Sequence, residues 1–262
     1  MYNSVINKIK KAKILIEPFP HLVVENLIPK NKLKHLNSVL PSFDEVSNKD
    51  CLLQSKSKTK KTILPDSKTF KKLSKQKIFK DINSTFKNIQ PILVKKFKKQ
   101  IEINLKKKYH KSKLDYHLSF SLMKKNYIKS PHLDRREHMI HGLFYPTSCK
   151  TGYGGNLLIK KIKKKQKIYD VFPPDKELKT HKKIGIKKNI CIFVLNTPQS
   201  YHSVDRYKGN EVRKYLYFVY DFKIKNPGTK FLNRKKGFNS NIFWNHEVKI
   251  KSKKRQKIFL TE

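Results

Sequence analysis

Two residues near the middle of the chain have the types and the spacing to hold a metal ion. His132 and Asp134 flank Leu133, and side chains two positions apart on a β-strand point to the same face. An imidazole and a carboxylate placed in this way supply two ligands of a 2-His-1-carboxylate triad, which leaves metal positions open in non-haem Fe(II) oxygenases. The tripeptide alone is weak evidence, because a hydrogen-bonded surface pair has the same pattern.

The third ligand must come from another strand, and His202 is the candidate. It follows the apolar run 190–195 and a turn that contains Pro198. A lone histidine in such a position is more often structural. The start of a strand after a turn nevertheless suits a metal ligand at the mouth of a barrel, and we expect His202 to complete the triad.

A chelating co-substrate suits the open iron positions, and 2-oxoglutarate can chelate iron through its 1-carboxylate and 2-keto oxygens. Its far carboxylate then needs a cation. Arg213 stands at the head of the next strand, and its planar fork binds a carboxylate bidentately. Arg213 shares a strand face with Tyr215, Tyr217 and Val219, whereas Lys214 lies on the apolar packing face. The spacing favours co-substrate binding over the alternative, a surface ion pair.

The elements that must position these residues are short strands. From residue 115 on, β-rich runs alternate with breaks rich in Gly, Pro, Asn and Lys. The runs span residues 116–123, 139–145, 156–162, 190–195, 200–204 and 214–222. Several short strands without intervening helices predict a β-sandwich or a jelly roll.

The segment before these strands predicts supporting elements. Residues 1–13 are basic, and we expect them to be frayed. Residues 17–29 predict a short strand that enters a turn, and a helix follows from about 30 to 40. Residues 44–68 are polar with little periodicity, and predict a long loop with at most one short strand.

Two further segments lie on either side of the predicted strands. Apolar residues at helical spacing between 70 and 105 predict two helices that are divided at Pro91 and pack on the sheet. Residues 226–262 are basic and irregular and contain the single tryptophan, Trp244. The pattern leaves open whether this extension packs partly on the core or binds a partner.

Several short motifs occur in one order between residues 17 and 222. They are Pro-Phe-Pro-His-Leu-Val-Val at 18–24, Pro-His-Leu-Asp at 131–134, Gly-Leu-Phe-Tyr at 142–145 and Gly-Gly-Asn-Leu at 154–157, followed by the turn that leads to His202 and by the Arg213 strand. Each motif is modest, but the ordered set is fairly specific. With these motifs the chain resembles the 2-oxoglutarate/Fe(II)-dependent oxygenase superfamily, in its prolyl-hydroxylase-like branch.

This resemblance implies a mainly β fold with flanking helices. The core is expected to be a double-stranded β-helix, or jelly roll, at residues 115–225. Helices and a strand within residues 1–114 would back it, and the basic extension at 226–262 would follow.

The resemblance also implies the chemistry. Fe(II) would be bound by His132, Asp134 and His202, with 2-oxoglutarate and O2 as co-substrates and ascorbate as a further cofactor. The implied reaction hydroxylates a substrate C–H bond and releases succinate and CO2. Tyr145 would hydrogen-bond the far carboxylate of 2-oxoglutarate, although a tyrosine of the core or the rim is an equally good interpretation. Pro146 stands where many relatives carry Leu, which leaves the register of that strand open.

Other residues with chemical potential receive no catalytic role. Among the remaining histidines of this half of the chain, His141 shares a strand face with Tyr145 and can line the pocket, and the others are expected at the surface. Those others are His110, His117, His138 and His181. The pair Gly154–Gly155 predicts a tight turn with positive φ. The cysteines Cys51, Cys149 and Cys191 show neither a disulfide framework nor a zinc motif, and Cys191 is expected to be a buried thiol.

The net charge of +43 raises a second function class. It suggests a basic module that binds nucleic acid or another polyanion. Only six of the 62 basic residues are Arg, however, and the bias to Lys, Ile and Asn is typical of an AT-rich genome. We therefore favour compositional drift, with nonspecific attraction to polyanions. Val219 stands where nucleic-acid demethylases of the superfamily carry a second Arg, which counts against that branch. A degenerate member without activity is also disfavoured, because the ligands and Arg213 are all present.

The setting and the substrate are less well defined. The chain shows no signal peptide and no run long enough to span a membrane, and a reducing, cytoplasmic location is expected. The substrate class stays open between a peptidyl residue, a glycan or lipid intermediate and a small metabolite. Substrate choice is expected to lie in the loops at 44–68, 146–154 and 163–188.

Overall fold

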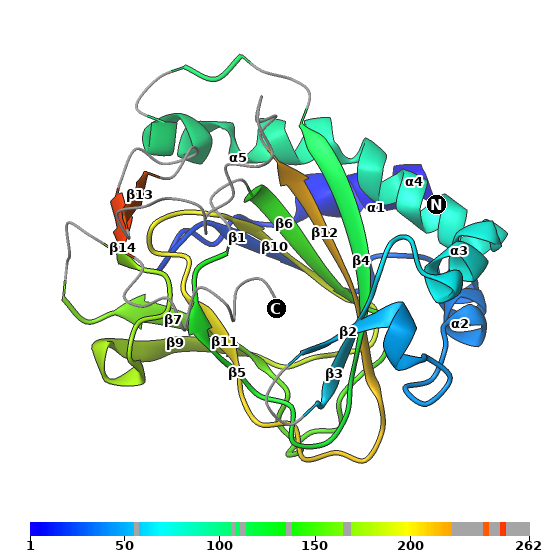
Figure 1. Cartoon of the computed structure of the whole chain (residues 1–262). Coiled ribbons are helices and arrows are strands. Elements are labelled where there is room, and N and C mark those ends of the chain that lie inside the picture. The colour runs from blue at the N-terminus through cyan, green and yellow to red at the C-terminus, as the bar shows by residue number, and fades with distance from the viewer. Residues whose placement is uncertain are drawn as a thin grey trace.

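Two facing β-sheets and a layer of helices make up the protein. The computed structural model describes residues 1–54, 58–105, 108–110, 114–134, 138–164, 169–221, 238–240 and 247–249. The larger sheet has seven strands in the order β1-β10-β6-β12-β4-β3-β2, and the smaller has four in the order β5-β11-β7-β9. The helices cover the outer face of the larger sheet, and the smaller sheet lies across its inner face (Figure 1).

The strands of the two sheets follow one another along the chain as a jelly roll requires. The larger sheet is built from β1 (His21–Val24), β2 (Cys51–Gln54), β3 (Lys60–Ile63), β4 (Asp115–Met123), β6 (His138–Tyr145), β10 (Ile190–Leu195) and β12 (Arg213–Asp221). The smaller sheet is built from β5 (Lys129–His132), β7 (Leu157–Ile162), β9 (Leu178–Ile184) and β11 (His202–Val204). From β4 to β12 the chain crosses repeatedly between the sheets, which is the winding of a double-stranded β-helix. The predicted fold class is therefore confirmed.

Helices from the N-terminal part of the chain form the outer layer. They are α1 (Tyr2–Lys11), α2 (Lys30–Val39), α3 (Lys68–Lys75), α4 (Lys77–Asn88) and α5 (Gln90–Leu105), with short 3-10 turns at Asn48–Asp50 and Asp175–Glu177. In α4, apolar side chains at helical spacing are buried against the sheet. Phe86 of this helix stacks on Phe218 of β12 with ring centroids 4.3 Å apart. This contact holds β12 against the helix layer. The opposite face of β12 lines the space between the sheets.

One glycine makes the stacking possible. Gly142 on β6 lies directly opposite Phe218 on β12. A Cβ at Gly142 would lie 2.2 Å from Cζ of Phe218, so only glycine lets the ring cross the neighbouring strand. The glycine of the Gly-Leu-Phe-Tyr motif thus has a packing role on the helix side of the sheet.

Most of the predicted elements are present. The six strands predicted after residue 115 correspond to β4, β6, β7, β10, β11 and β12, and the helix predicted from about residue 30 is α2. The chain breaks between α4 and α5 just before Pro91, as predicted. Gly154 and Gly155 have φ values of 71° and 72°, as a tight turn requires. Cys191 is fully buried.

The prediction that residues 1–13 are frayed is wrong. Tyr2–Lys11 form α1, in which Val5 and Ile9 are completely buried. These two residues are four apart and therefore share one helix face. Nζ of Lys96 on α5 donates to the carbonyl of Lys10 at 2.7 Å. Lys10, Lys11 and Lys13 are exposed, whereas Lys8 is half-buried and donates to the carbonyl of Asn26.

Other deviations concern polar strands and a helix break. Residues 44–68 contain two strands, β2 and β3, where at most one was predicted, and they extend the larger sheet beyond β4. The loop predicted at 163–188 contains β9, whose residues between Leu178 and Ile184 are exposed. The helical stretch 70–105 contains a further break at Gln76, so three helices form where two were predicted.

The structure leaves the C-terminal extension largely outside the described residues. Within it, β13 (Phe238–Ser240) and β14 (Glu247–Lys249) pair with each other, and β14 pairs with β8 (Tyr169–Asp170). Trp244 lies outside the described residues. The proposed boundaries at 115 and 226 stay predictions. Strands β1 to β3, from before residue 115, belong to the same sheet as the core strands.

Candidate metal centre

The two histidines of the predicted triad lie opposite each other on neighbouring strands. His132 ends β5 and His202 begins β11, and the two form a direct cross-strand pair in the smaller sheet. Their ring centroids are 4.4 Å apart. Asp134 lies two residues beyond the end of β5 rather than on the strand itself. Leu133 between them is buried in the core, as the alternation predicts.

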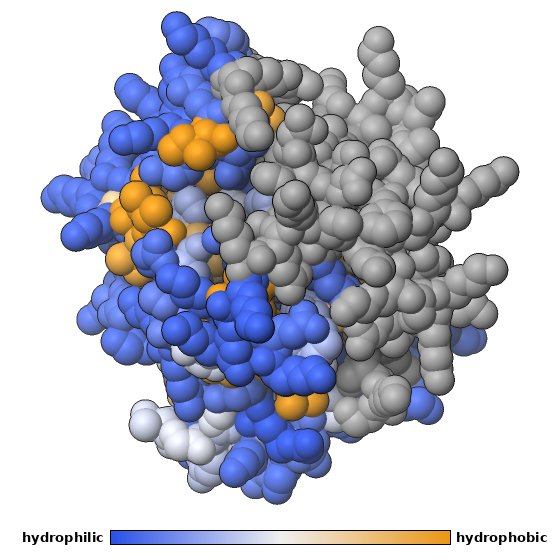
Figure 2. Space-filling model, turned by 90° about the vertical axis from the view of Figure 1, so that its left-hand side faces the viewer, coloured by the Kyte–Doolittle hydropathy of each residue, from blue (hydrophilic) through white to orange (hydrophobic). Residues whose placement is uncertain are grey.

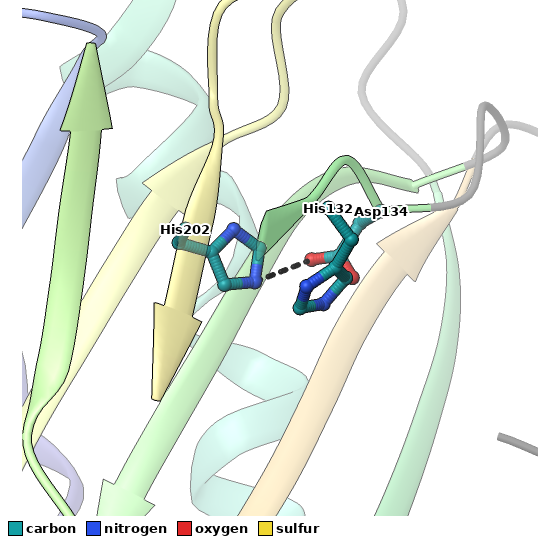
Figure 3. Close-up of side chains that lie close together, drawn as sticks. All are labelled: His132, Asp134 and His202. Carbon is teal, nitrogen blue, oxygen red and sulfur yellow. Dashed lines mark ion pairs between the residues drawn. The ribbon is translucent and has the colours of Figure 1, made fainter. Parts of the chain in front are cut away.

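Asp134 brings its carboxylate between the two imidazoles (Figure 3). Its Oδ1 lies 3.8 Å from Nε2 of His132, and its Oδ2 lies 3.8 Å from Nε2 of His202. One ligand atom from each of the three residues lies within 4.8 Å of the others. The sequence prediction therefore named three residues that the fold brings together, with the donor set of a 2-His-1-carboxylate site.

Backbone carbonyls fix the orientation of both imidazoles. Nδ1 of His132 lies 2.9 Å from the carbonyl oxygen of Ser130, and Nδ1 of His202 lies 3.0 Å from that of Ser200. A carbonyl can only accept, so Nδ1 of each ring must carry the proton. In the neutral form of each ring, Nε2 then carries the lone pair on the side of Asp134, which is the tautomer that binds a metal.

The electrostatics favour the protonation states that a metal needs. Burial lowers the pKa of His132 well below its ordinary value, and nearby His202 and Lys129 lower it further. Burial alone would raise the pKa of Asp134, but His141, His202 and His132 hold it well below the usual range. His132 is thus neutral and the Asp134 carboxylate is ionised near neutral pH, as metal ligands must be.

His141 on β6 is a further member of the centre. It is completely buried, and its Nδ1 lies 3.1 Å from Oδ2 of Asp134. Burial lowers the pKa of His141 to about 4, so the ring is neutral at pH 7. Strand alternation predicted that His141 points to the pocket side. That it contacts the Asp134 carboxylate could not be predicted, because this contact joins two sheets.

The four histidines that were expected at the surface have different environments. His110, His117 and His181 are exposed, as predicted. His138 is half-buried, and its Nδ1 lies 2.6 Å from Oδ1 of Asp221. The expected surface position of His138 is therefore wrong, because Asp221 at the end of β12 holds it at the cavity wall.

The metal centre opens into a cavity of about 490 Å³ between the two sheets. The cavity is lined by His132, Asp134 and His202 on one side and by the inward residues of β12 on the other. These inward residues are Arg213, Tyr215, Tyr217, Val219 and Asp221. The alternation predicted that the face of Arg213 is the pocket face, and the structure agrees.

Arg213 is a buried cation with unused hydrogen-bonding capacity. It is 1% exposed, which excludes a surface ion pair. Its guanidinium carbon lies 4.8 Å from the ring centroid of Tyr145, and its Nη1 donates to Sδ of Met123 at 3.5 Å. Among the described residues, its Nε and Nη2 have no hydrogen-bond partner. A buried guanidinium with two unpaired donors fits an anion with two acceptor oxygens.

Tyr145 lies beside Arg213 and is itself buried at the cavity wall. Burial raises its pKa, so its hydroxyl remains protonated and can donate a hydrogen bond. This position is compatible with either role that the sequence left open.

Comparisons with known proteins show which solved structures share this fold. No family model matches the chain, and no curated protein matches its sequence. A prolyl-4-hydroxylase from Pseudomonas putida matches with a TM-score of 0.51 at 10% sequence identity, over 86% of this chain and 100% of that one. The chain has the fold of a prolyl hydroxylase. The epimerase SnoN, solved with Fe3+, alpha ketoglutarate and nogalamycin RO, matches with a TM-score of 0.50 at 9% identity, over 84% of this chain and 83% of that one. At such identities the prolyl-hydroxylase fold is what is shared, and the site must carry any functional conclusion.

Proposed function

We propose that the protein is an Fe(II)- and 2-oxoglutarate-dependent dioxygenase that hydroxylates its substrate. The observation that carries the proposal is one cavity that contains both a 2-His-1-carboxylate set and a buried arginine, two of whose donors have no partner in the part of the chain that the structure describes. The metal set alone fits many reactions. The arginine adds the requirement for an anion inside the same cavity, which a chelating 2-oxo diacid meets.

Each residue has a defined task in this proposal. His132, Asp134 and His202 hold Fe(II) and leave the remaining positions open for 2-oxoglutarate and O2. Arg213 binds the far carboxylate through Nε and Nη2, and the Tyr145 hydroxyl donates to the same carboxylate. When bound, the iron would supply the oxidative chemistry, in which one oxygen atom of O2 goes to succinate as 2-oxoglutarate loses CO2, and the other converts a substrate C–H bond to C–OH. Ascorbate is proposed as the reductant that keeps the iron in its Fe(II) state.

The protein's further contribution is orientation and exclusion of water. The backbone carbonyls of Ser130 and Ser200 keep both Nε2 atoms directed at the metal position. His141 stands behind the Asp134 carboxylate and limits its rotation. Contacts of this kind around metal ligands keep them in the binding orientation before the metal arrives.

The alternative, a basic module for nucleic acid or another polyanion, explains less. Figure 2 shows a face on which most of the described surface is hydrophilic and apolar residues gather only in small patches. Such a surface suits solvated lysines and nonspecific attraction. It gives no reason for burying Arg213 beside a metal-binding set.

The three free cysteines bear on the cellular compartment of the protein. Cys51 and Cys191 are buried in the core as free thiols, and Cys149 is also free. Free thiols and an Fe(II) centre both suit a reducing compartment, and we propose the cytoplasm. No helix among the described residues has the length and apolarity to cross a membrane.

The test of the proposed function uses Fe(II)-loaded protein prepared without oxygen. The visible charge-transfer absorption of 2-oxoglutarate chelated to Fe(II) is measured first, and succinate is measured after O2 is admitted. We expect both signals, and we expect the His202→Ala variant to lose both. The control is His181→Ala, which removes an exposed histidine on β9 and should leave both unchanged. Absence of the absorption together with absence of succinate in the unaltered protein would overturn the proposal.

A further inference from the structure

A short segment outside the two main sheets contacts both strands that supply the metal ligands. It consists of Asp170, Val171 and Phe172, and we call it the bracket. Asp170 is the last residue of β8, and both Asp170 and Val171 are buried. The bracket belongs neither to the metal set nor to the proposed co-substrate site at Arg213.

The first contact of the bracket reaches the strand of His202. The hydroxyl of Tyr201 donates to the carbonyl of Asp170 at 2.8 Å. Tyr201 directly precedes His202 and is completely buried. Its own backbone carbonyl accepts from the N–H of Lys160 at 2.9 Å. Tyr201 thus ties the start of β11 to β7 through its backbone and to the bracket through its side chain.

The second and third contacts reach the strand of His132. The N–H of Leu133 donates to the carbonyl of Val171 at 2.9 Å. Leu133 lies between His132 and Asp134, so this bond holds the backbone that joins two ligands. The ring of Phe172 lies beside the ring of His132, with centroids 6.4 Å apart and an angle of 25° between the planes. One segment therefore contacts both ligand strands.

Strand pairing alone holds these ligands only in part. β5 is an edge strand of the smaller sheet, and among the described strands β11 is its neighbour there. His132 is the last residue of β5 that pairs with β11, and Asp134 lies beyond it. Terminal residues of an element open more readily than its centre. The bond from Leu133 to Val171 is formed at this end of the strand, where a further hold is needed.

The bracket is itself fixed. The N–H of Phe172 donates to Oδ1 of Asp170 at 3.1 Å, which closes a turn at the end of β8. Aspartate side chains commonly bond to the backbone two residues further on in this way. In addition, Asp170 pairs with Lys249 of β14. A segment held by these contacts can set the distance between the two ligand strands.

We propose that the bracket positions the metal ligands, and that Tyr201 and Phe172 are its positioning residues. Neither residue supplies a ligand atom. Tyr201 acts on His202 through the backbone of β11, and Phe172 acts on the imidazole of His132 through its ring. This inference rests on the proposed function and deepens it, because it assigns the affinity and the geometry of the metal centre partly to residues outside the donor set.

The experiment measures binding of Mn(II) to the full-length metal-free protein. EPR of the free ion gives the affinity, and the spectrum of the bound ion reports the geometry of its ligands. Loss of a contact behind metal ligands weakens metal binding about 10- to 100-fold. We expect roughly 10-fold weaker binding in Tyr201→Phe and in Phe172→Leu, at the low end of this range, because both residues act through other groups. The spectrum of the bound ion should change in both variants.

Tyr220→Phe is the matched control. The hydroxyl of Tyr220 is also buried and also donates to a backbone carbonyl, that of Phe86, but it does so on the helix side of the larger sheet. The control loses the same kind of bond and should keep both the affinity and the spectrum. Urea unfolding shows that each variant is folded under the assay conditions.

The double variant Tyr201→Phe/Phe172→Leu tests whether one segment carries both effects. Residues that act through a shared element are not additive. The loss of Mn(II) affinity in the double variant should therefore be smaller than the product of the two single losses.

Three results would overturn the bracket. Unchanged Mn(II) affinity in Tyr201→Phe or in Phe172→Leu would show that the contact in question positions no ligand. An equal loss in Tyr220→Phe would assign the effect to weakened packing in general. Losses that multiply in the double variant would show two independent contacts. If the unaltered protein itself fails to bind Mn(II), the metal centre of the proposed function fails, and the bracket falls with it.

Discussion

Arg213→Met should make the metal-free protein more stable while it strongly weakens co-substrate binding. Arg213 is 1% exposed, and its Nε and Nη2 have no partner among the described residues. A buried unpaired donor costs about 1–3 kcal/mol, and more when it is charged. Methionine has a similar length and no donors, so the variant should gain about 1–3 kcal/mol in the absence of ligand. Residues kept at a cost to stability are typical of functional sites.

The loss of affinity follows from the same two donors. A hydrogen bond to a charged group contributes roughly 1.5–3 kcal/mol, so two of them contribute roughly 3–6 kcal/mol. At about 1.4 kcal/mol for each factor of ten, Arg213→Met should weaken 2-oxoglutarate by roughly 10²- to 10⁴-fold. Binding of the metal ion should change little, because Arg213 is not a ligand.

Urea unfolding of the metal-free proteins and calorimetric titration of 2-oxoglutarate into the Mn(II)-loaded proteins measure both effects. Arg206→Met is the matched control, because Arg206 is exposed. If Arg213→Met binds 2-oxoglutarate within threefold of the unaltered protein, Arg213 does not hold the co-substrate. If the variant is instead less stable without ligand, the stacking on Tyr145 outweighs the unpaired donors and the energetic reasoning fails.

Three further outcomes are expected. His141→Leu should weaken Mn(II) binding about 10- to 100-fold, as loss of a contact behind a metal ligand does, and unchanged affinity in an equilibrium titration would contradict this role. The pKa of His141 is about 4 in the folded protein against an ordinary 6.5; unfolding therefore takes up a proton between these pH values, and the metal-free protein should lose up to about 3 kcal/mol between pH 6.5 and 4. Urea unfolding at several pH values measures this loss, and an equally steep dependence in His141→Leu would refute its origin. Gly142→Ala should destabilise the protein by about 1–3 kcal/mol, because its Cβ would overlap the Phe218 ring, and an unchanged unfolding midpoint would show that the ring can move.

The fold could be predicted wherever burial imposes a period on the sequence. β10 is buried along its whole length, and its continuous apolar run predicts its bounds. β9 is an edge strand with charged residues between Leu178 and Ile184, so it has no apolar period. The short helix α1 buries only Val5 and Ile9. Two core residues in a segment that also contains three lysines are too few to distinguish a helix from a frayed end.

The metal set could be predicted from residue types and their order along the chain rather than from strand geometry alone. His132 and Asp134 are two positions apart, but Asp134 lies beyond the end of β5, and His202 follows a turn, so the ordered set of motifs was needed to join the three residues. His141 was harder, because its contact with Asp134 depends on how the smaller sheet lies over the larger one. No period in the sequence encodes the distance between two sheets.

Lys60 shows why the cavity wall is the least predictable part of this site. A strand beside a core alternates apolar and polar residues, but a strand beside a cavity can be polar on its inner face. β3 presents Lys60 and Thr62 to the cavity, and its outer face carries Lys61 and Ile63. Both faces therefore contain lysine, and the segment resembles a loop. The register of β3 against β4 decides which lysine faces the cavity, because a shift of one residue would turn Lys60 away and bring Lys61 inward. In the structure Lys61 donates to the carbonyls of Phe43 and Val46 instead. That contact on the outer face holds the register that keeps Lys60 in the cavity.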